Sequence, residues 1–142
     1  MQVRPAALGD ASDVALLLDT LGYPCTRDEA AERIVRTLGD PRHYLLLAEV
    51  DGAAAGLISL NLIYSLTRGA DVARITALVV APNCERQGVG RRLLGEVDAI
   101  ARRCGASRLE VTSNPSRVDA HAFYRSCGYT DGLQHLVKLL GD

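Results

Sequence analysis

The chain has 142 residues, of which 48% are apolar, so it can bury one hydrophobic core and is predicted to form a single domain over residues 1–142. Its 16 Lys and Arg residues nearly cancel its 17 Asp and Glu residues, which excludes an overall field that would recruit nucleic acid or an anionic membrane. No apolar run approaches the roughly 20 residues that cross a bilayer, and the 4 cysteines form no C-x-x-C pair. We therefore expect a cytoplasmic protein with reduced thiols and no bound metal.

Two short helices are predicted near the start of the chain. Asp10 or Ser12 can cap a helix that continues to about Leu21, where the apolar residues at helical spacing end. Thr26 can cap a second helix that ends near Gly39, since the Asp-Pro that follows forbids continuation. Both helices are expected to precede the sheet.

A hairpin and a buried strand are predicted next. Segments 44–50 and 53–63 flank Asp51-Gly52, which suits a two-residue turn because both positions tolerate a positive φ. Segment 72–80 is almost continuously apolar, as in a strand buried on both faces. We place that strand at the centre of the sheet.

An amphipathic helix is predicted over residues 88–104, with apolar residues along one stripe and charged residues opposite. The alternating segment 108–112 follows as a strand. Because a crossover helix of this length returns the chain to the same end of the sheet, this strand should be parallel to segment 72–80 and beside it. A last helix over 118–127 and a last strand over 133–140 complete a mixed α/β fold.

The stretch Glu-Arg-Gln-Gly-Val-Gly-Arg-Arg at 85–92 lies between a buried strand and an amphipathic helix. A helix start offers unpaired N–H groups and a partial positive charge, and Gly88 and Gly90 let the backbone approach a phosphate closely. Nearby arginines add positive charge that the nearly neutral chain lacks as a whole: Arg86, Arg91 and Arg92. The stretch predicts a pyrophosphate site.

Two other phosphate motifs fit this stretch poorly. Glu110 lies about 20 residues beyond Gly90, as the acidic residue of a dinucleotide-binding fingerprint would. However, Leu93 replaces the third glycine, and 7 residues separate Val80 from Gly88, whereas that fingerprint needs its glycines directly after the strand. A Walker loop is excluded because no Gly-Lys-Ser or Gly-Lys-Thr follows.

Two segments resemble the GNAT acyltransferase superfamily. Residues 73–82 and the Arg-Gln-Gly-Val-Gly-Arg-Arg-Leu-Leu of 86–94 are similar to its cofactor-binding core, with the motif R/Q-x-x-G-x-G/A. Residues 120–129, Ala-His-Ala-Phe-Tyr-Arg-Ser-Cys-Gly-Tyr, resemble its later A-x-x-F-Y-x-x-x-G-[FY] segment. Together the motifs cover roughly residues 73–130 and are specific in combination.

The resemblance implies a GNAT-like α/β (α+β) fold with helices on both faces of a mixed, mostly antiparallel sheet. That sheet would have about six or seven strands, with a central parallel pair splayed open. The resemblance also implies acetyl-coenzyme A as co-substrate and no metal. The residues it assigns to the coenzyme are Leu78, Val79 and Val80 through their backbone, Arg86, Gln87, Gly88, Val89, Gly90 and Arg91 in the loop, and Asn114 near the pantetheine amides.

The chemistry implied by the resemblance is direct attack of a primary amine on the thioester in a ternary complex, without an acyl-enzyme. Positioning supplies most of the acceleration, and a backbone N–H of the strand at 72–80 stabilises the oxyanion. Tyr124 matches the family's general acid for the departing thiolate. Glu110, Glu49 and His121 are candidates for the base, and none is favoured over an ordinary paired or surface role.

Glu85 departs from the family motif, which has Arg or Gln at its position. A carboxylate there repels a pyrophosphate unless it points to solvent or pairs with Arg86, so we expect weakened coenzyme binding without loss of function. Cys84 precedes the loop with no histidine near it in the sequence, so we assign it a structural role.

The acceptor is expected to be a small-molecule amine or a protein amino group. Its specificity should come from the first two helices, Tyr23-Pro24 and segment 63–72. The family often forms dimers, so a homodimer is an expectation that no feature of this sequence fixes. A non-catalytic sensor of acyl-coenzyme A, which would bind without releasing thiol, is the alternative function.

Overall fold

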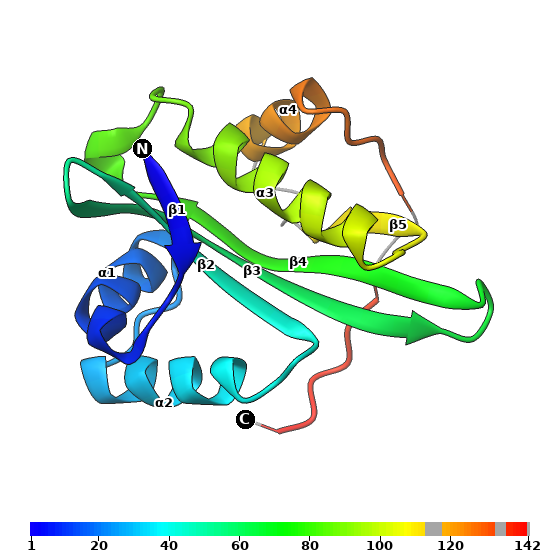
Figure 1. The fold of residues 1–142 in the computed structure, drawn as a ribbon, viewed down its shortest axis with the longest axis horizontal. Helices are drawn as coiled ribbons and strands as arrows, with labels where there is room; N and C mark the ends of the chain where they lie inside the picture. The colour runs from blue at the N-terminus through cyan, green and yellow to red at the C-terminus, as the bar shows by residue number, and fades with distance from the viewer. Residues whose placement is uncertain (113–117, 133–135, 142) are drawn as a thin grey trace. The chain divides into compact units, whose positions relative to one another are not determined.

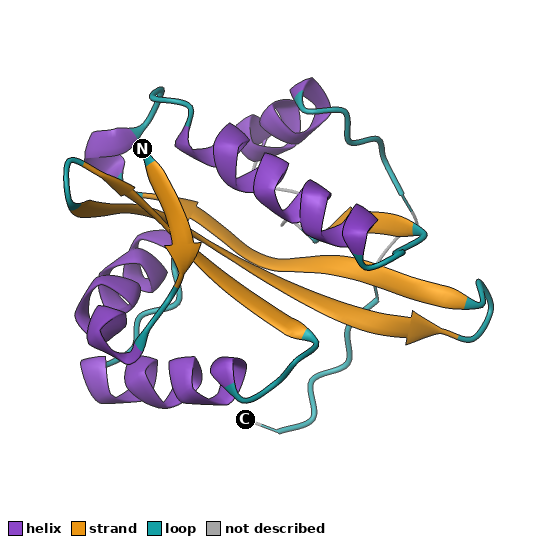
Figure 2. Cartoon of the chain, in the orientation of Figure 1, coloured by secondary structure: helices purple, strands orange, loops and turns teal. Residues whose placement is uncertain are grey.

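The computed structural model describes residues 1–112, 118–132 and 136–141 (Figures 1 and 2). The chain divides into two compact units, Met1–Thr112 and Ser113–Asp142. The first unit holds a sheet with helices on both faces, and the second holds helix α4 (Val118–Ser126).

Five strands form one sheet in the described residues, in the order β1-β2-β3-β4-β5. Strands β1 to β4 pair antiparallel, and β5 is parallel to β4. The predicted mixed, mostly antiparallel sheet with one parallel pair is therefore confirmed, although in the described sheet this pair lies at one edge and not at the centre. The strands are β1 (Gln2–Pro5), β2 (His43–Val50), β3 (Ala53–Ser65), β4 (Ala70–Val80) and β5 (Arg108–Val111).

Helices α1 (Ala11–Leu21) and α2 (Arg27–Leu38) cover one face of the sheet, and α3 (Val89–Arg103) covers the other (Figure 1). Thr26 begins α2 as predicted, because its hydroxyl accepts from the N–H of Glu29 at 3.0 Å and its own N–H donates to the Glu29 carboxylate at 2.9 Å. This reciprocal capping satisfies two N–H groups that a helix start leaves without partners.

Asp10 precedes α1, as predicted, but its carboxylate makes no capping hydrogen bond to that helix. It accepts from the N–H of Ala7 at 2.7 Å and from two nitrogens of Arg4, both at 2.8 Å. Asp10 therefore secures the turn between β1 and α1, and Arg4 holds the pKa of that carboxyl below its ordinary value.

Both hairpins agree with simple turn chemistry, but the second is longer than predicted. Asp51 and Gly52 have φ values of 52° and 78°, which confirms the predicted two-residue turn. Strand β3 continues to Ser65 and β4 already begins at Ala70, so most of segment 63–72 is paired strand rather than a substrate-facing loop. The turn between them ends at Gly69, whose φ of 64° favours glycine.

The strand count differs from the predicted six or seven. Strand β1 was not predicted, because Gln2–Pro5 is short and has no clear apolar alternation. The predicted last strand over 133–140 is wrong for residues 136–140, which have no regular structure, while 133–135 lie outside the described residues. The apolar side chains there are between 76% and 91% exposed: Leu136, Val137, Leu139 and Leu140. A segment with alternating apolar residues forms a strand only where a neighbouring strand pairs with its backbone.

Gly56 on β3 fixes the approach of α3 to the sheet. A Cβ at this position would lie 2.8 Å from Val89 Cγ1, 3.2 Å from Leu93 Cδ1 and 3.0 Å from the Val79 carbonyl oxygen. Val89 and Leu93 are fully buried, so the first turn of α3 packs directly on the backbone of β3. The absence of a side chain at Gly56 therefore positions the N-terminus of α3 beside the end of β4.

Candidate active site

The stretch of residues 85–90, called the glycine loop below, follows a 3-10 turn at Pro82–Cys84 after β4 and includes the first two residues of α3. Arg86 and Gly88 have φ values of 65° and 80°, so the backbone turns twice through the left-handed region. Gly88 is the N-cap of α3 and no side chain caps the helix, while a Cβ on Gly88 would meet nothing within 4 Å. The start of α3 is therefore open in front of Gly88, which is the geometry of an anion site built from backbone amides.

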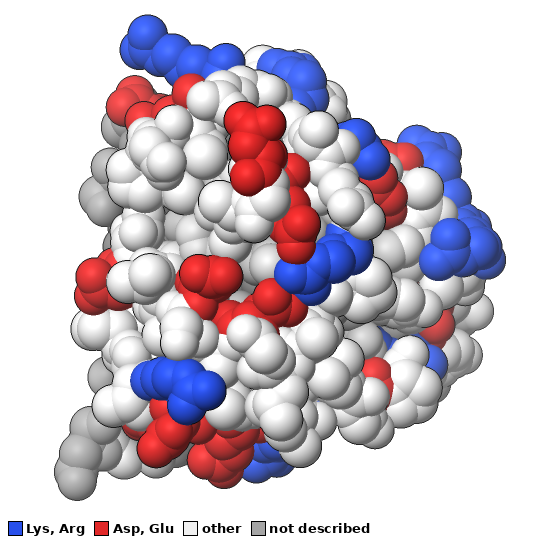
Figure 3. All heavy atoms as spheres, turned by 60° about the vertical axis from the view of Figure 1, so that its left-hand side comes forward, with Lys and Arg blue, Asp and Glu red and all other residues white. Residues whose placement is uncertain are grey.

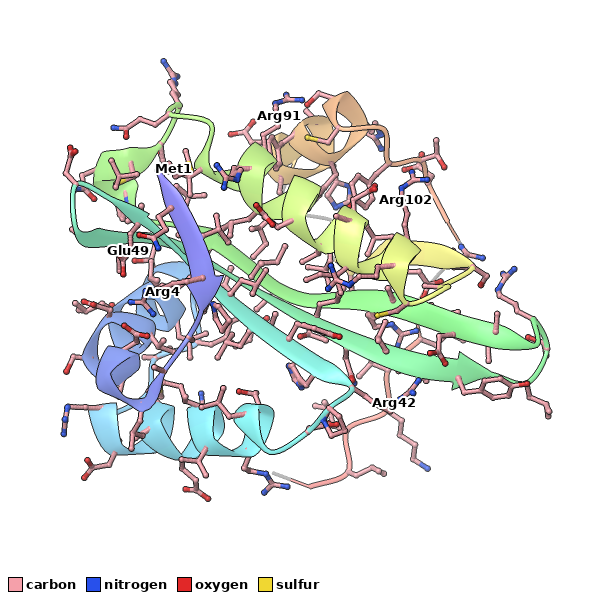
Figure 4. The ribbon with its side chains drawn as sticks, viewed as in Figure 1. Met1, Arg4, Arg42, Glu49, Arg91 and Arg102 are labelled. Atoms are coloured by element: carbon pink, nitrogen blue, oxygen red, sulfur yellow. The ribbon has the colours of Figure 1, made fainter. Side chains whose placement is uncertain are left out.

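Exposure around the glycine loop separates anchoring residues from ligand-facing ones. Val89 and Gly90 are buried, whereas the preceding residues 85–88 are exposed, as is Arg91. Figure 4 shows Arg91 on the first turn of α3. Arg92 donates to Glu96 at 3.0 Å on the same helix, so its charge is partly compensated. Arg86, Arg91 and Arg92 are all exposed at the start of the helix or in the loop before it.

Glu85 is exposed and forms no ion pair with Arg86. Of the two arrangements that would relieve repulsion of a pyrophosphate, the structure therefore has the one in which water screens the carboxylate. Cys84 is 8% exposed and its thiol lies 3.7 Å from Asn83 Oδ1, in keeping with the structural role assigned to it.

Strands β4 and β5 pair over only part of β4. Their parallel register runs from Val72 with Arg108 to Ile75 with Val111, and β4 then continues to Val80. In the described part of the chain, no strand pairs with residues 76–80 on that side. The edge of β4 along residues 76–80, called the opening below, carries the backbone of Leu78, Val79 and Val80. That the two strands splay apart there stays a prediction.

A β-bulge marks the point where the pairing of β4 with β5 ends. Ser59 pairs with Ala77 and Leu60 pairs with Ile75, so Thr76 is the extra residue on β4. Thr76 is exposed, and its hydroxyl donates to Ser59 Oγ at 2.9 Å. Ser59 Oγ lies 2.7 Å from Nε2 of His43 on β2. Bulges re-aim side chains, and this one places the Thr76 hydroxyl against Ser59 on β3, one residue beyond the last pair of β4 and β5.

Sequence reasoning missed His43, Ser59 and Thr76. No local motif contains them, because 16 residues separate His43 from Ser59 and 17 separate Ser59 from Thr76. The correct register of both hairpins was the signal that could have found them, since it places all three on adjacent strands.

The two carboxylates considered as bases are both held by arginines. Arg4 Nε donates to Glu49 Oε1 at 2.6 Å, and Figure 4 shows these side chains next to each other on β1 and β2. Glu110 lies 3.2 Å from Arg74 Nη2 and 3.1 Å from Arg108 Nε. Both carboxylates are therefore engaged in hydrogen bonds with guanidinium groups.

Acidic and basic side chains lie close together on the face that contains β1 and α1. Figure 3 shows acidic groups gathered over the middle of that face, with basic groups beside them. The pairs that Arg4 forms with Asp10 and Glu49 belong to this region. Arg4 thus compensates part of the acidic charge on this face.

The second unit carries Tyr124 and His121 on α4. The Tyr124 ring lies 5.7 Å from that of Phe123 and 5.8 Å from that of Tyr129, in tilted and edge-on contacts. His121 Nε2 is buried and has no hydrogen-bond partner among the residues that the structure describes. Asn114, assigned by resemblance to the pantetheine arm, lies outside the described residues. The role of Tyr124 as an acid stays a prediction.

Neither a metal site nor a membrane span is found in the described residues. No three His, Cys, Asp or Glu side chains there are grouped so that they could hold a metal ion. None of the helices described is both long and apolar enough to cross a bilayer.

An open N-terminus of α3 beside a parallel strand pair that ends partway along β4 defines an acyl-coenzyme A transferase architecture. The chain belongs to the Acetyltransferase (GNAT) family, whose model matches residues 14–129. It is an acetyl-coenzyme A-dependent N-acetyltransferase.

Two curated relatives cover most of the chain. An aminoalkylphosphonate N-acetyltransferase from Salmonella typhimurium is 34% identical over 144 residues, covering 98% of this chain and 91% of that protein. An aminoglycoside N(6')-acetyltransferase type 1 from Stenotrophomonas maltophilia is 31% identical over 133 residues, covering 91% and 86%.

Among solved structures, a putative acetyltransferase from Agrobacterium tumefaciens has a TM-score of 0.89 at 22% identity, covering 99% of this chain and 100% of that one. This likeness shows the shared fold.

Proposed function

We propose that the chain acetylates the primary amine of a small molecule by direct attack on acetyl-coenzyme A in a ternary complex. The observation that carries this proposal is the open start of α3 at Gly88, next to the edge of β4 at residues 76–80, where none of the described residues forms a pairing strand. The first feature suits a pyrophosphate and the second suits an extended pantetheine arm, which can accept and donate backbone hydrogen bonds as a strand would.

The proposed coenzyme contacts follow from this arrangement. The exposed Arg86 and Arg91 supply charge to the pyrophosphate. Backbone groups of Gln87, Gly88, Val89 and Gly90 form the cradle, backbone groups of Leu78, Val79 and Val80 line the arm, and Asn114 contacts the pantetheine amides. Tyr124 gives a proton to the departing thiolate. We also infer that residues 1–142 act as one domain, because the family model spans parts of both units.

The acceptor is proposed to carry an anionic group beside its amine. Arg74 lies two residues before Thr76 on β4 and shares Glu110 with Arg108, so this cluster has two guanidinium groups for one carboxylate. Arg74 and Arg108 are 38% and 33% exposed at their side chains, which leaves them open to a ligand. One curated relative acts on aminoalkylphosphonates, amines of this kind.

A polycationic acceptor matches the charges near the opening less well than an amine that carries an anionic group. The other curated relative is an aminoglycoside acetyltransferase, whose substrate class needs carboxylates that are free to bind ammonium groups. Near the opening, Glu110 is held by two arginines, and Asp71 accepts from Arg42 at 2.7 Å.

Thiol release from acetyl-coenzyme A, measured with matched amines, tests the proposal. We expect kcat/KM for 2-aminoethylphosphonate to exceed that for ethylamine at least tenfold, or about 1.4 kcal/mol. Arg74→Gln should remove most of this preference, whereas Arg102→Gln, in an exposed pair with Asp98 on α3, should keep it. Higher kcat/KM for an aminoglycoside or for a peptide amino group would overturn the acceptor class. Calorimetric binding of acetyl-coenzyme A with no thiol release from any amine would indicate the sensor instead.

A further inference from the structure

A hydrogen-bonded chain of three side chains crosses three adjacent strands and ends at the opening beside β4. His43 on β2 lies 2.7 Å from Ser59 on β3 through Nε2 and Oγ, and Thr76 on β4 donates to Ser59 Oγ at 2.9 Å. Ser59 is 8% exposed, whereas Thr76 is exposed. These hydrogen bonds therefore connect a half-buried imidazole to the surface where the pairing of β4 with β5 ends.

The distances indicate which side chain donates and which accepts in each of these hydrogen bonds. A hydroxyl has one proton, and that of Thr76 lies closer to Ser59 Oγ, at 2.9 Å, than to the Ser59 carbonyl oxygen, at 3.4 Å. Ser59 Oγ then accepts from Thr76, and its own proton is available to Nε2 of His43. This assignment makes Nε2 an acceptor and leaves both lone pairs of Thr76 Oγ1 able to accept from an ammonium group.

The surroundings of His43 favour its neutral form. Burial lowers the pKa of His43, and the Asp40 carboxylate opposes this with a smaller effect. The sheet-facing residues of α1 and α2 are uncharged: Ala11, Val14, Leu17, Ala30, Ile34 and Thr37. The neighbouring Arg42 is occupied by Asp71 and by the Leu62 carbonyl oxygen. A neutral imidazole at pH 7 is able to take up a proton.

We infer that Thr76, Ser59 and His43 form the relay that removes a proton from the acceptor ammonium group, with Thr76 contacting the amine and His43 receiving the proton. This inference rests on the proposed function, because it needs an amine in the opening beside Thr76. It assigns the base that neither Glu49 nor Glu110 supplies, since arginines hold both carboxylates.

The proton balance is complete with these groups. The ammonium N–H proton passes to Thr76 Oγ1 as the Thr76 proton moves to Ser59 and the Ser59 proton moves to His43, leaving a neutral amine and an imidazolium. The amine lone pair then forms the C–N bond at the thioester carbonyl, and collapse of the tetrahedral adduct breaks the C–S bond. Tyr124 gives its proton to the thiolate, the second proton lost from nitrogen restores the Tyr124 phenol, and His43 returns its proton to water.

The pH dependence of kcat/KM with the preferred amine tests the relay. We expect the wild-type rate to rise with pH as His43 loses its proton, and His43→Gln to lower kcat/KM at pH 7 at least tenfold and to remove this acid limb. The glutamine side chain can still accept from Ser59, so the calorimetric affinity for acetyl-coenzyme A should stay within twofold. His121→Gln should leave the acid limb in place.

Two substitutions at the exposed end of the relay separate proton transfer from folding. Thr76→Val removes the hydroxyl at similar volume and should lower kcat at least tenfold, while Thr76→Ser keeps the hydroxyl and should retain most of the rate. Ser107→Ala, which removes an exposed hydroxyl from the turn before β5, is the matched control and should be silent.

An unchanged acid limb in His43→Gln, loss of that limb in His121→Gln, or equal rates for the two Thr76 variants would each overturn the relay. Failure of the proposed function has a different signature, namely no thiol release by the wild-type protein.

Discussion

The coenzyme side and the acceptor side of the first unit are built in different ways. The glycine loop is one short stretch of chain, and its ligand-binding groups are mainly backbone amides presented by residues 85–90. The relay of His43, Ser59 and Thr76 is assembled from side chains on three strands, far apart in the sequence. The first depends on local conformation, whereas the second depends on the register of two hairpins.

This difference determines what can vary without loss of function. A backbone cradle tolerates changes in most side chains, which explains how Glu85 can stand at a motif position that has Arg or Gln in the family. A side-chain relay tolerates no loss of a hydroxyl or imidazole, but its residues can be replaced as a set. Coenzyme binding is thus expected to be shared among proteins with this fold, whereas the acceptor amine is expected to differ between them.

Gly88→Val is the strongest way to break the backbone-built site. A β-branched residue at a φ of 80° is strained, and its Cβ would enter the space in front of α3. Strain of about 1–2 kcal/mol lowers the free energy of unfolding, whereas loss of a charge-assisted hydrogen bond worth about 1.5–3 kcal/mol predicts acetyl-coenzyme A affinity reduced by about one to two orders of magnitude. Calorimetry measures this.

Gly105→Val is the control for that substitution. Gly105 has a φ of 74° beyond the opposite end of α3, and a Cβ added there would meet nothing within 4 Å. It should lose similar stability but keep coenzyme affinity. Equal affinity losses in the two variants would mean that the effect of Gly88 is on folding.

The same contrast between local conformation and strand register explains which parts of the structure could be predicted from the sequence. Local signals located the ends of α2, the Asp51-Gly52 turn and the parallel crossover, because caps, turns and periodicity depend on neighbouring residues. They gave the glycine loop for the same reason. They missed β1 and wrongly predicted a strand over 136–140, because ladder partners decide both. They missed Thr76 because a bulge is a property of two paired strands.

Tyr124→Phe tests whether the Tyr124 hydroxyl acts in the chemical step. If the phenol protonates the leaving thiolate, removing its hydroxyl should lower kcat at least tenfold while the affinity for acetyl-coenzyme A changes less than twofold. Tyr129→Phe removes a hydroxyl from the ring that contacts Tyr124 and should keep wild-type turnover. Burst and steady-state measurements of thiol release would show the effect. Wild-type kcat in Tyr124→Phe would remove this side chain from the mechanism.

Gly56→Ala gives the smallest expected effect and tests how the two sides are connected. The new Cβ would lie 2.8 Å from Val89 Cγ1 and 3.0 Å from the Val79 carbonyl oxygen, so the first turn of α3 must shift away from β3. Overpacking of this kind costs about 1–3 kcal/mol, and we expect the free energy of unfolding to fall by about 1.5 kcal/mol, with roughly threefold weaker binding of acetyl-coenzyme A. Gly95→Ala on α3 meets nothing within 4 Å and should instead stabilise the protein by about 0.5–1 kcal/mol. Chemical denaturation measures both changes in the free energy of unfolding. If both variants were stabilised or both destabilised, the close contact between β3 and α3 would not be the feature that positions the glycine loop.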